Sequence, residues 1–351
     1  MCLKSKTLPG HFPHFETSNK HLSHCSPPPS SAMVTHYSLD NAISSFFESM
    51  TSATRQQCDD FALGHTGGQP SPVQIQGTFS YTVAVGATKI LQFRVLDPSL
   101  DMHVMSLAKA VHPQFVASCK YHGTIGRSRP VHIYEMENLP GAAYIIARSI
   151  STIQSADAVS PAAQHCERPS EVRVYHTMMS TFQAGADHAC SFFAQSWNSR
   201  RRLDLDNMAT LQAEFESKCD VLTRSLPPRF TSNLHGVRQS PPSLFSETFP
   251  FVLNHGDLCE MNILIGRETG NITGIVDWAE ARILPFGFAL WGLENILGCM
   301  DSTGWHYYDN RRELEDRLWR AFRTGLTMRR RATCSSSEVR GWRACSGGMG
   351  L

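Results

Sequence analysis

Residues 251–278 read FVLNHGDLCEMNILIGRETGNITGIVDW and decide which fold the chain is expected to adopt. The tripeptide HGD at 255–257 is followed by Asn262, five residues after Asp257, and by Asp277, fifteen residues after the asparagine. The apolar runs NILI and ITGIVDW flank the turn sequence GRETGN, a pattern that predicts a β-hairpin. Because a hairpin brings its two ends together, Asn262 and Asp277 are expected side by side and near Asp257.

Oxygen-bearing side chains in this arrangement suit phosphoryl transfer to a hydroxyl. In that reaction a carboxylate orients the attacking hydroxyl and accepts its proton, while oxygen ligands hold Mg²⁺ against the nucleotide phosphates. Kinases carry these groups on the loop H-R-D-x-x-x-x-N. Residues 255–262, HGDLCEMN, keep the aspartate-to-asparagine spacing, with Gly256 in place of the arginine. A single aspartate on a loop is an ordinary turn or capping residue, so the indication comes from the complete pattern.

The stretch resembles the aminoglycoside phosphotransferase and choline kinase family, in particular its many uncharacterised fungal-type members, whose signature is H-G-D-x-x-x-x-N followed by I-D-W or I-D-F. The chain has HGDLCEMN and IVDW, and the resemblance extends over about 58–328. It implies an α+β, bilobal protein-kinase-like fold, with a small antiparallel-sheet N-lobe and a mainly helical C-lobe. By this resemblance Asp257 is the catalytic base, Asn262 and Asp277 bind Mg²⁺, and His255 supports the loop.

The activity that the resemblance implies is an ATP- and Mg²⁺-dependent phosphotransferase, which moves the γ-phosphate to a hydroxyl of a small molecule. ATP would bind between the lobes. The acceptor is left open, because one fold serves many acceptors. A protein kinase is disfavoured, because Gly256 replaces the loop arginine and no A-P-E segment follows Asp277.

Strand-like stretches before residue 100 are expected to cover the nucleotide phosphates. By the resemblance Ser80, Tyr81 and Thr82 lie on the phosphate-covering loop, although the G-x-G-x-x-G of protein kinases is absent. The third strand should present a cation to the phosphates, and Arg94 occupies that position, with Lys89 as the alternative. Their spacing of five puts them on opposite strand faces, so at most one points into the cleft. The plainer alternative for Arg94 is an exposed strand residue without a ligand.

The segment YEMENLPG fits the hinge between the lobes. Backbone groups around Met136, Glu137 and Asn138 would then hydrogen-bond the adenine of ATP. The same residues are also compatible with a plain strand and turn, so this assignment depends wholly on the fold.

A carboxylate that braces the N-lobe cation is missing from its usual place. Kinases take it from a glutamate of the next helix, but no glutamate occurs between Arg94 and Glu135. Asp101, at the start of a helix expected over 98–110, either supports the cation or caps that helix. This departure leaves a second hypothesis open, a catalytically weak or inactive binding or scaffold protein of the same fold.

Composition limits the remaining classes of function. The chain has 351 residues, with 32 Lys+Arg against 31 Asp+Glu, and a net charge of +1 gives no global case for binding nucleic acid or an anionic membrane. No run of about 18 apolar residues predicts a membrane span. The 11 cysteines are scattered without a C-x-x-C pair and no secretory signal is visible, which favours free thiols in the cytoplasm. We expect a monomer by default, with ATP and a small hydroxyl-bearing substrate as partners.

Four segments are expected along the chain. They are a Pro-, Ser- and His-rich disordered tail over 1–38, an N-lobe with a preceding helix over 39–140, a helical C-lobe over 141–328, and a basic atypical tail over 329–351. Within them, apolar spacing predicts helices over 39–64, 171–195, 205–225, 287–298 and 311–326, and a Pro/Ser-rich surface loop over 227–243. Met33 is an alternative start, and a phosphate or nucleic-acid contact is the alternative for the arginine-rich end.

Overall fold

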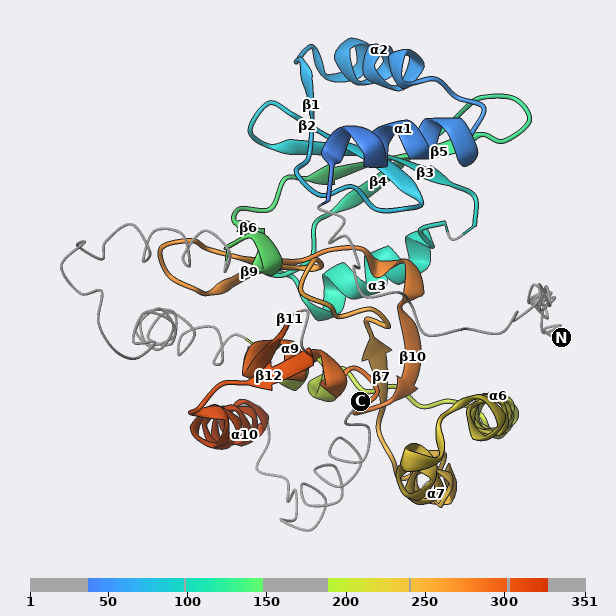
Figure 1. Ribbon diagram of the computed structural model, residues 1–351, viewed down its shortest axis with the longest axis vertical. Coiled ribbons are helices and arrows are strands. Elements are labelled where there is room, and N and C mark those ends of the chain that lie inside the picture. The colour runs from blue at the N-terminus through green and yellow to red at the C-terminus, as the bar shows by residue number, and fades with distance from the viewer. Residues whose placement is uncertain (1–36, 98, 148–188, 240, 302–303, 328–351) are drawn as a thin grey trace, which may run out of the picture. The chain divides into compact units, whose positions relative to one another are not determined.

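The computed structural model describes residues 37–97, 99–147, 189–239, 241–301 and 304–327, drawn in colour in Figure 1. The described residues from Leu39 onward belong to one compact unit. Residues 1–36 of the first expected tail, the whole second tail over 329–351 and most of the expected helix over 171–195 lie outside the described residues. Within the described part of that helix, residues 189–198 are helical.

A five-stranded antiparallel sheet with strand order β1-β2-β3-β5-β4 forms the N-terminal part. Its strands are β1 (Pro70–Pro72), β2 (Ser80–Val85), β3 (Lys89–Val95), β4 (Cys119–Ile125) and β5 (Val131–Glu137). Arg94 of β3 lies opposite Ser80 on one side and His132 on the other, so these three side chains share a face of the sheet. Tyr81 and Phe93 project from the opposite face. Strand β4 was not expected, because its sequence CKYHGTI has few apolar residues and is mostly half-buried or exposed.

Two helices, α1 (Leu39–Ser49) and α2 (Arg55–Thr66), pack beside this sheet, where the sequence predicted a single helix over 39–64. The break comes from the capping box that starts α2. The Thr54 hydroxyl accepts from the Gln57 amide, and the Gln57 side chain accepts from the Thr54 amide. An apolar cluster then joins both helices to the sheet, with members that include Ile43, Phe46, Cys58, Ala62, Tyr81, Leu91 and Phe93.

Helices dominate the C-terminal part. Besides the helical residues 189–198, they are α6 (Leu205–Ser225), α7 (Thr231–Arg238), α8 (Pro241–Leu244), α9 (Glu294–Leu297) and α10 (Arg311–Thr327), with the 3₁₀ turns η1 (Pro228–Phe230), η2 (Trp278–Glu280) and η3 (Leu290–Leu293). Helices α6 and α10 confirm the predictions over 205–225 and 311–326. The surface loop predicted over 227–243 is wrong, since most of it is helical. Proline at the first position of a helix needs no amide hydrogen, so Pro228 and Pro241 start helical turns here.

Short antiparallel strands frame residues 251–278. Strands β6 (Ala142–Ala143), β8 (Ile263–Ile265) and β9 (Ile272–Ile275) form one small sheet, while β7 (Phe251–Asn254) pairs with β10 (Arg282–Pro285). The β8–β9 hairpin is therefore confirmed. The helix predicted over 287–298 is broken into η3 and α9, and the hairpin of β11 (Gly298–Asp301) and β12 (Gly304–Tyr307) follows.

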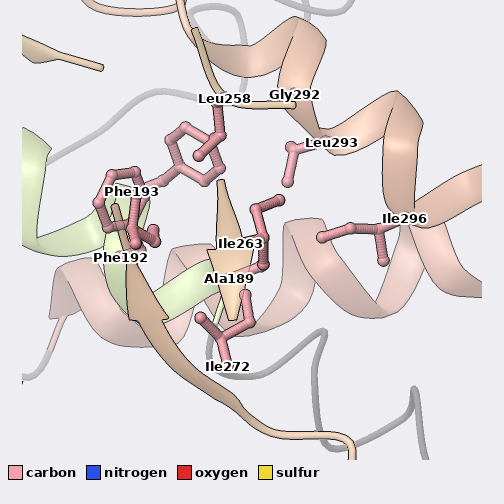
Figure 2. A pocket seen from close by; sticks show the side chains of 10 residues that line it. Ala189, Phe192, Phe193, Leu258, Ile263, Ile272, Gly292, Leu293 and Ile296 are labelled. Atoms are coloured by element: carbon pink, nitrogen blue, oxygen red, sulfur yellow. The ribbon is translucent and has the colours of Figure 1, made fainter. Parts of the chain in front are cut away.

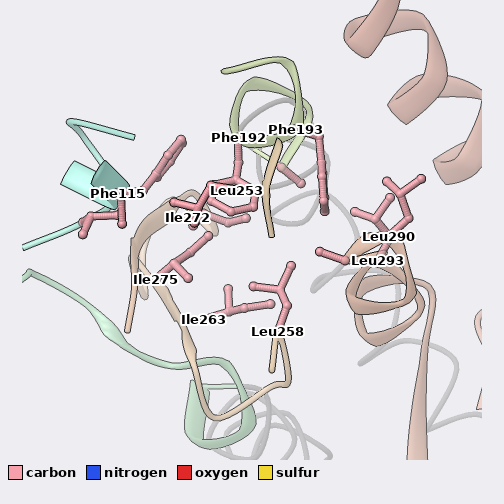
Figure 3. Packing of buried hydrophobic residues seen from close by; sticks show 14 of the residues in the cluster. Phe115, Phe192, Phe193, Leu253, Leu258, Ile263, Ile272, Ile275, Leu290 and Leu293 are labelled. Carbon is pink, nitrogen blue, oxygen red and sulfur yellow. The ribbon is translucent and has the colours of Figure 1, made fainter. Parts of the chain in front are cut away.

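The main apolar cluster packs helix α3 (Met102–Val111) and the segment after it against C-terminal elements. Figure 3 shows part of it, with Phe115 and Ile275 on one side and Leu290 and Leu293 on the other. The fold is thus α+β, with an antiparallel-sheet N-lobe and a mainly helical C-lobe, as the resemblance implied. Among the described residues, no helix has the length and apolar character needed to cross a bilayer.

Candidate active site

The loop between β7 and β8 brings Asp257 and Asn262 together. The Asn262 side-chain amide donates to the backbone oxygen of Asp257 at 2.8 Å and to its carboxylate oxygen Oδ2 at 3.0 Å. The loop itself is tightly turned, with Cys259 N donating to Asp257 O and Asn262 N donating to Cys259 O, both at 3.0 Å. The amide thus fixes the carboxylate and leaves its own oxygen, Oδ1, for another role.

His255 connects this loop to the strand that returns toward it. Its ring is fully buried, with Nε2 2.9 Å from the Val276 carbonyl oxygen and Nδ1 3.3 Å from the Asp257 amide nitrogen. These partners fit a neutral ring that donates from Nε2 and accepts at Nδ1. Burial lowers the pKa of His255, which favours the same neutral form. Trp278 packs edge-on against the ring, with centroids 4.7 Å apart.

Gly256 is the residue that this loop requires between His255 and Asp257. Its φ of 84° lies in the left-handed region, and a Cβ added there would lie 2.3 Å from the Glu280 carbonyl oxygen. Any side chain would therefore push the loop away from η2. In the sequence, Gly256 looked like a simple replacement for the kinase arginine. The structure shows that the close backbone approach excludes a side chain.

Asp277 lies at the end of the hairpin, next to the loop. Val276 N donates to Asn262 O at 2.9 Å, which holds the two ends of the hairpin together. Asp277 has φ 62° and ψ 67°, and among the described residues it is the one non-glycine residue with positive φ. Its side chain is 35% exposed. Aspartate tolerates this conformation better than most residues.

Arg94 completes the constellation from the N-lobe. Its Nη1 donates to Asp277 Oδ1 at 2.9 Å, and the residue is only 3% exposed. Lys89, the other candidate cation, lies on the opposite face of β3, where its Nζ donates to Glu135 Oε1 at 2.6 Å. Of the two cations, Arg94 is the one next to the aspartate.

With this geometry in place, the sequence comparison decides the family. The profile described as the phosphotransferase enzyme family matches residues 130–330, more than half of the chain and the whole of the loop and hairpin. The chain belongs to the phosphotransferase enzyme family. No curated protein sequence gives a significant match.

Solved structures with a similar course of the chain include other phosphotransferases. A macrolide 2'-phosphotransferase type I has 14% identity and a TM-score of 0.48, over 85% of this chain and 91% of its own. A macrolide 2'-phosphotransferase from Brachybacterium faecium has 14% identity and a TM-score of 0.46, over 84% of this chain and 87% of its own. An aminoglycoside phosphotransferase from Streptomyces rimosus, in complex with ADP and streptomycin, has 11% identity and a TM-score of 0.44, over 84% of this chain and 98% of its own.

Three expected phosphate-loop residues of this phosphotransferase-family chain lie elsewhere. Ser80, Tyr81 and Thr82 belong to strand β2, and the loop precedes them over residues 73–79. Tyr81 is buried among the N-lobe core and donates its hydroxyl to Asp59 at 2.8 Å, and burial raises its pKa. Ser80 and Thr82 share the face of Arg94, since strand residues two apart point the same way. The β-branched and aromatic run SYTVAV favours a strand, which explains why these three residues lie in β2 and not on the loop.

In the expected hinge, Met136 to Asn138, two of the backbone amides donate hydrogen bonds within the N-lobe. The Glu137 amide donates to Ser118 O at 3.4 Å, and the Asn138 amide donates to Thr88 O at 2.8 Å. Those two donors are therefore engaged in this arrangement. Met136 is half-buried and packs against the main apolar cluster.

Asp101 acts as a helix cap. Its carboxylate Oδ1 accepts from the amides of His103 at 2.7 Å and Val104 at 3.3 Å, at the start of α3. Of the two functions that the sequence left open for Asp101, the structure supports capping. The N-lobe cation is instead paired directly with Asp277.

A buried residue behind the loop, His112, was missed by the sequence interpretation. Its Nδ1 lies 3.1 Å from Gln195 Oε1, its Nε2 lies 3.2 Å from Ser196 Oγ, and its ring stacks on Phe192. Burial lowers the pKa of His112 to about 4, so the ring is neutral at physiological pH. An isolated histidine at a helix end carries no periodic signal, so nothing in the sequence marked it.

The base of the loop is held by apolar packing. Leu258 lines a small apolar pocket together with Phe193, Ile263 and Leu293. Figure 2 shows the side chain of Leu258 near Gly292. A Cβ on Gly292 would lie 2.7 Å from the Leu258 side chain, so the glycine lets η3 approach the loop closely. The residue after the candidate base is thereby anchored in the C-lobe core.

Proposed function

We propose that the chain is an ATP- and Mg²⁺-dependent phosphotransferase that transfers the γ-phosphate to a hydroxyl group of a small molecule. The observation that carries the proposal is the convergence of Asp257, Asn262, Asp277 and Arg94 at one place, from two lobes of a phosphotransferase-family chain. Proximity and electrostatic stabilisation supply most of the catalysis in phosphoryl transfer, so such a preorganised cluster suits the reaction.

Asp257 is proposed as the general base. The Asn262 side-chain amide donates to Oδ2 of Asp257, which supports a fixed orientation of this carboxylate. Oδ1 of Asp257 is then left to accept the proton of the acceptor hydroxyl. His255 would act on the base only through the backbone, because its Nδ1 accepts from the Asp257 amide. The buried, neutral imidazole therefore serves as a rigid support.

Asn262 and Asp277 are proposed as the Mg²⁺ ligands. Their donor set, an amide oxygen and a carboxylate, fits a hard cation that usually binds one or two protein carboxylates plus substrate phosphates. The hydrogen bonds of the Asn262 amide nitrogen to Asp257 orient its oxygen, which supports this assignment. Bound Mg²⁺ supplies charge neutralisation at the β- and γ-phosphates.

Arg94 is proposed as the cation that steadies the nucleotide phosphates. A guanidinium stays charged when buried and offers several donors in a fixed plane. One of these donors bonds Asp277, so Arg94 would link the position of the aspartate to that of the phosphates. The charge of Arg94 would be balanced by Asp277, without a glutamate from α3.

The adenine is proposed to lie against the end of β5. Met136 is in register with Ile90, and alternation from His132 places its side chain on the sheet face of Arg94. Ser80 and Thr82 share that face and would lie over the phosphates. The amides of Glu137 and Asn138 already donate hydrogen bonds within the N-lobe. We therefore expect the carbonyl oxygens of this segment, more than these amides, to hydrogen-bond the adenine.

The test is phosphoryl transfer from γ-labelled ATP, with GTP compared as donor, in the presence of Mg²⁺. The acceptors would be aminoglycosides, macrolides, choline, ethanolamine and sugars, and ADP release without acceptor would report transfer to water. Asp257→Asn and Asp277→Asn should each lose at least about 100-fold in kcat/KM. Asp60→Asn, at an exposed site on α2, is the matched control and should keep full activity.

Nucleotide binding is measured separately by thermal unfolding, so that an untested acceptor is not mistaken for an inactive site. Mg²⁺–ATP should raise the unfolding midpoint of the wild type through its preference for the folded state. Stabilisation without any transfer or ADP release would favour the binding-protein hypothesis. Equal activity in wild type and Asp257→Asn would contradict the role of this base.

A further inference from the structure

Away from the candidate active site, His65, His122 and Glu135 converge on the α2-facing side of the N-terminal sheet. His65 comes from the last turn of α2, His122 from β4 and Glu135 from β5. Nε2 of each histidine lies 2.9 Å from Glu135 Oε2. One ligand atom from each of the three residues lies within 4.8 Å of the others. Three separate elements thus bring two imidazole nitrogens and one carboxylate oxygen into one cluster.

We propose that this triad binds a divalent transition-metal ion of the zinc class. Two imidazoles and one carboxylate form a donor set suited to Zn²⁺, with the fourth position left for water. In a tetrahedral site with bonds of about 2.0–2.1 Å, donor atoms lie about 3.3 Å apart. The two 2.9 Å separations from Glu135 would open by a few tenths of an ångström, and the three ligand atoms already lie within 4.8 Å of one another.

The carboxylate is held in place from its far side. Lys89 Nζ donates to Glu135 Oε1 at 2.6 Å, and the Glu135 side chain is 11% exposed. One oxygen is thereby fixed by the ammonium, and the other faces both imidazoles. Such a hydrogen bond to a ligating carboxylate orients it for the metal.

His122 lies in a β-bulge, on the sheet face of Glu135. The pairing of β4 with β5 shifts register between Tyr121 and Thr124, and Gly123 within the bulge has φ 99°. Bulges re-aim side chains and often occur at functional sites on edge strands, and β4 is an edge strand of this sheet.

An aromatic ring borders the triad on one side. Phe61, one turn before His65 on α2, stacks on it with centroids 5.5 Å apart and lies 6.4 Å from the His122 ring. The two imidazoles meet edge-on, with centroids 4.4 Å apart. An apolar border of this kind restricts water and fixes ring orientation around a metal.

The test is titration of the full-length protein with Zn²⁺ after treatment with EDTA and dialysis. Calorimetry should give one equivalent bound by the triad, and Zn²⁺ should raise the thermal unfolding midpoint. His65→Gln and His122→Gln should each weaken that binding by more than about 100-fold. His103→Gln, an exposed histidine on α3, is the matched control and should bind like wild type. Circular dichroism of each metal-free variant checks that the fold is retained.

Cobalt(II) identifies the ligands independently. Bound Co²⁺ should show visible bands without the intense near-ultraviolet charge-transfer band of a thiolate ligand, which separates this site from any formed by the chain's 11 cysteines. A thiolate band, no saturable binding to the wild type, or unchanged binding in both histidine variants would overturn the proposal. The triad would then be a hydrogen-bonded cluster in which both imidazoles donate to Glu135. None of these readouts depends on phosphotransferase activity.

Discussion

Arg94 and Asp277 are 183 residues apart in the chain, and a 2.9 Å hydrogen bond joins Nη1 of the arginine to Oδ1 of the aspartate. The bond links the third strand of the N-lobe to the end of the β8–β9 hairpin. Arg94 is buried, and this partly exposed carboxylate compensates its charge. Any nucleotide phosphate that Arg94 meets would therefore meet a cation already fixed in direction.

Arg94→Met should abolish the electrostatic contribution to phosphate binding. We expect a fall of at least about 100-fold in kcat/KM for phosphoryl transfer, because one preorganised donor is typically worth that much. Lys89→Met is the matched control, since it removes a cation from the same strand but the opposite face. Its kcat/KM should stay within about threefold of wild type. Steady-state kinetics with Mg²⁺–ATP would check this, and equal losses in both variants would contradict the assignment of Arg94.

Gly256→Ala should unfold or misplace the loop between β7 and β8. The added Cβ meets the Glu280 carbonyl oxygen and also takes a left-handed backbone, so we expect a loss of about 2–4 kcal/mol in the free energy of unfolding. Gly86→Ala tests the backbone effect alone, because Gly86 has φ 61° and no atom within 4 Å of an added Cβ. Gly86→Ala should lower the free energy of unfolding by about 1–2 kcal/mol. Urea unfolding of both variants gives the comparison, and equal costs would rule out the close approach to Glu280.

Asp101→Ala should lower stability by about 1 kcal/mol, because the first turn of α3 loses its cap. Asp101→Ser keeps a capping oxygen and should recover most of that loss. Neither change should alter the KM for ATP, since the carboxylate bonds the amides of His103 and Val104. Thermal unfolding and ATP kinetics on the two variants separate the alternatives. A raised KM in both variants would restore the idea that Asp101 supports the N-lobe cation.

His112 should make the fold sensitive to acid. Burial lowers its pKa from 6.5 to about 4, so between these values the unfolded chain binds a proton that the folded chain does not. The neutral ring therefore makes its full contribution to the free energy of unfolding above pH 6.5 and loses it as pH falls toward 4. Over this range the free energy of unfolding should fall by roughly 3 kcal/mol.

His112→Gln should flatten this dependence. The variant starts from a lower stability at pH 7.5 but should lose less between pH 7.5 and 4.5, as measured by urea unfolding at each pH. His255 is the titratable group that faces His112, and burial lowers its pKa as well, so part of the slope should persist in the variant. A slope equal to that of wild type would show that His112 does not cause it.

The parts of the fold that the sequence predicted well are those with local, periodic signals. Helix α6 and the β8–β9 hairpin carry clear apolar spacing and a turn, and both occur where expected. The split between α1 and α2 was missed because a capping box at Thr54 interrupts an otherwise continuous helical pattern. Strand β4 was missed because, at the edge of the sheet, it has no strongly buried face.

The candidate site was predictable in its motif and less so in its surroundings. Asp257 and Asn262 are only five residues apart, so their proximity could be predicted from one sequence. The choice between Arg94 and Lys89 needed strand register, and the role of Gly256 needed its distance to Glu280. Such contacts join distant segments, which no local pattern records.

The left-handed backbone at Asp277 selects among residues in two separate ways. Its φ of 62° admits aspartate, asparagine and glycine but penalises glutamate, whereas the proposed role as a negatively charged metal ligand admits only aspartate and glutamate. Aspartate alone passes both criteria. Shape and charge at this position can therefore be separated by substitution, with Asp277→Asn keeping the backbone and Asp277→Glu keeping the carboxylate.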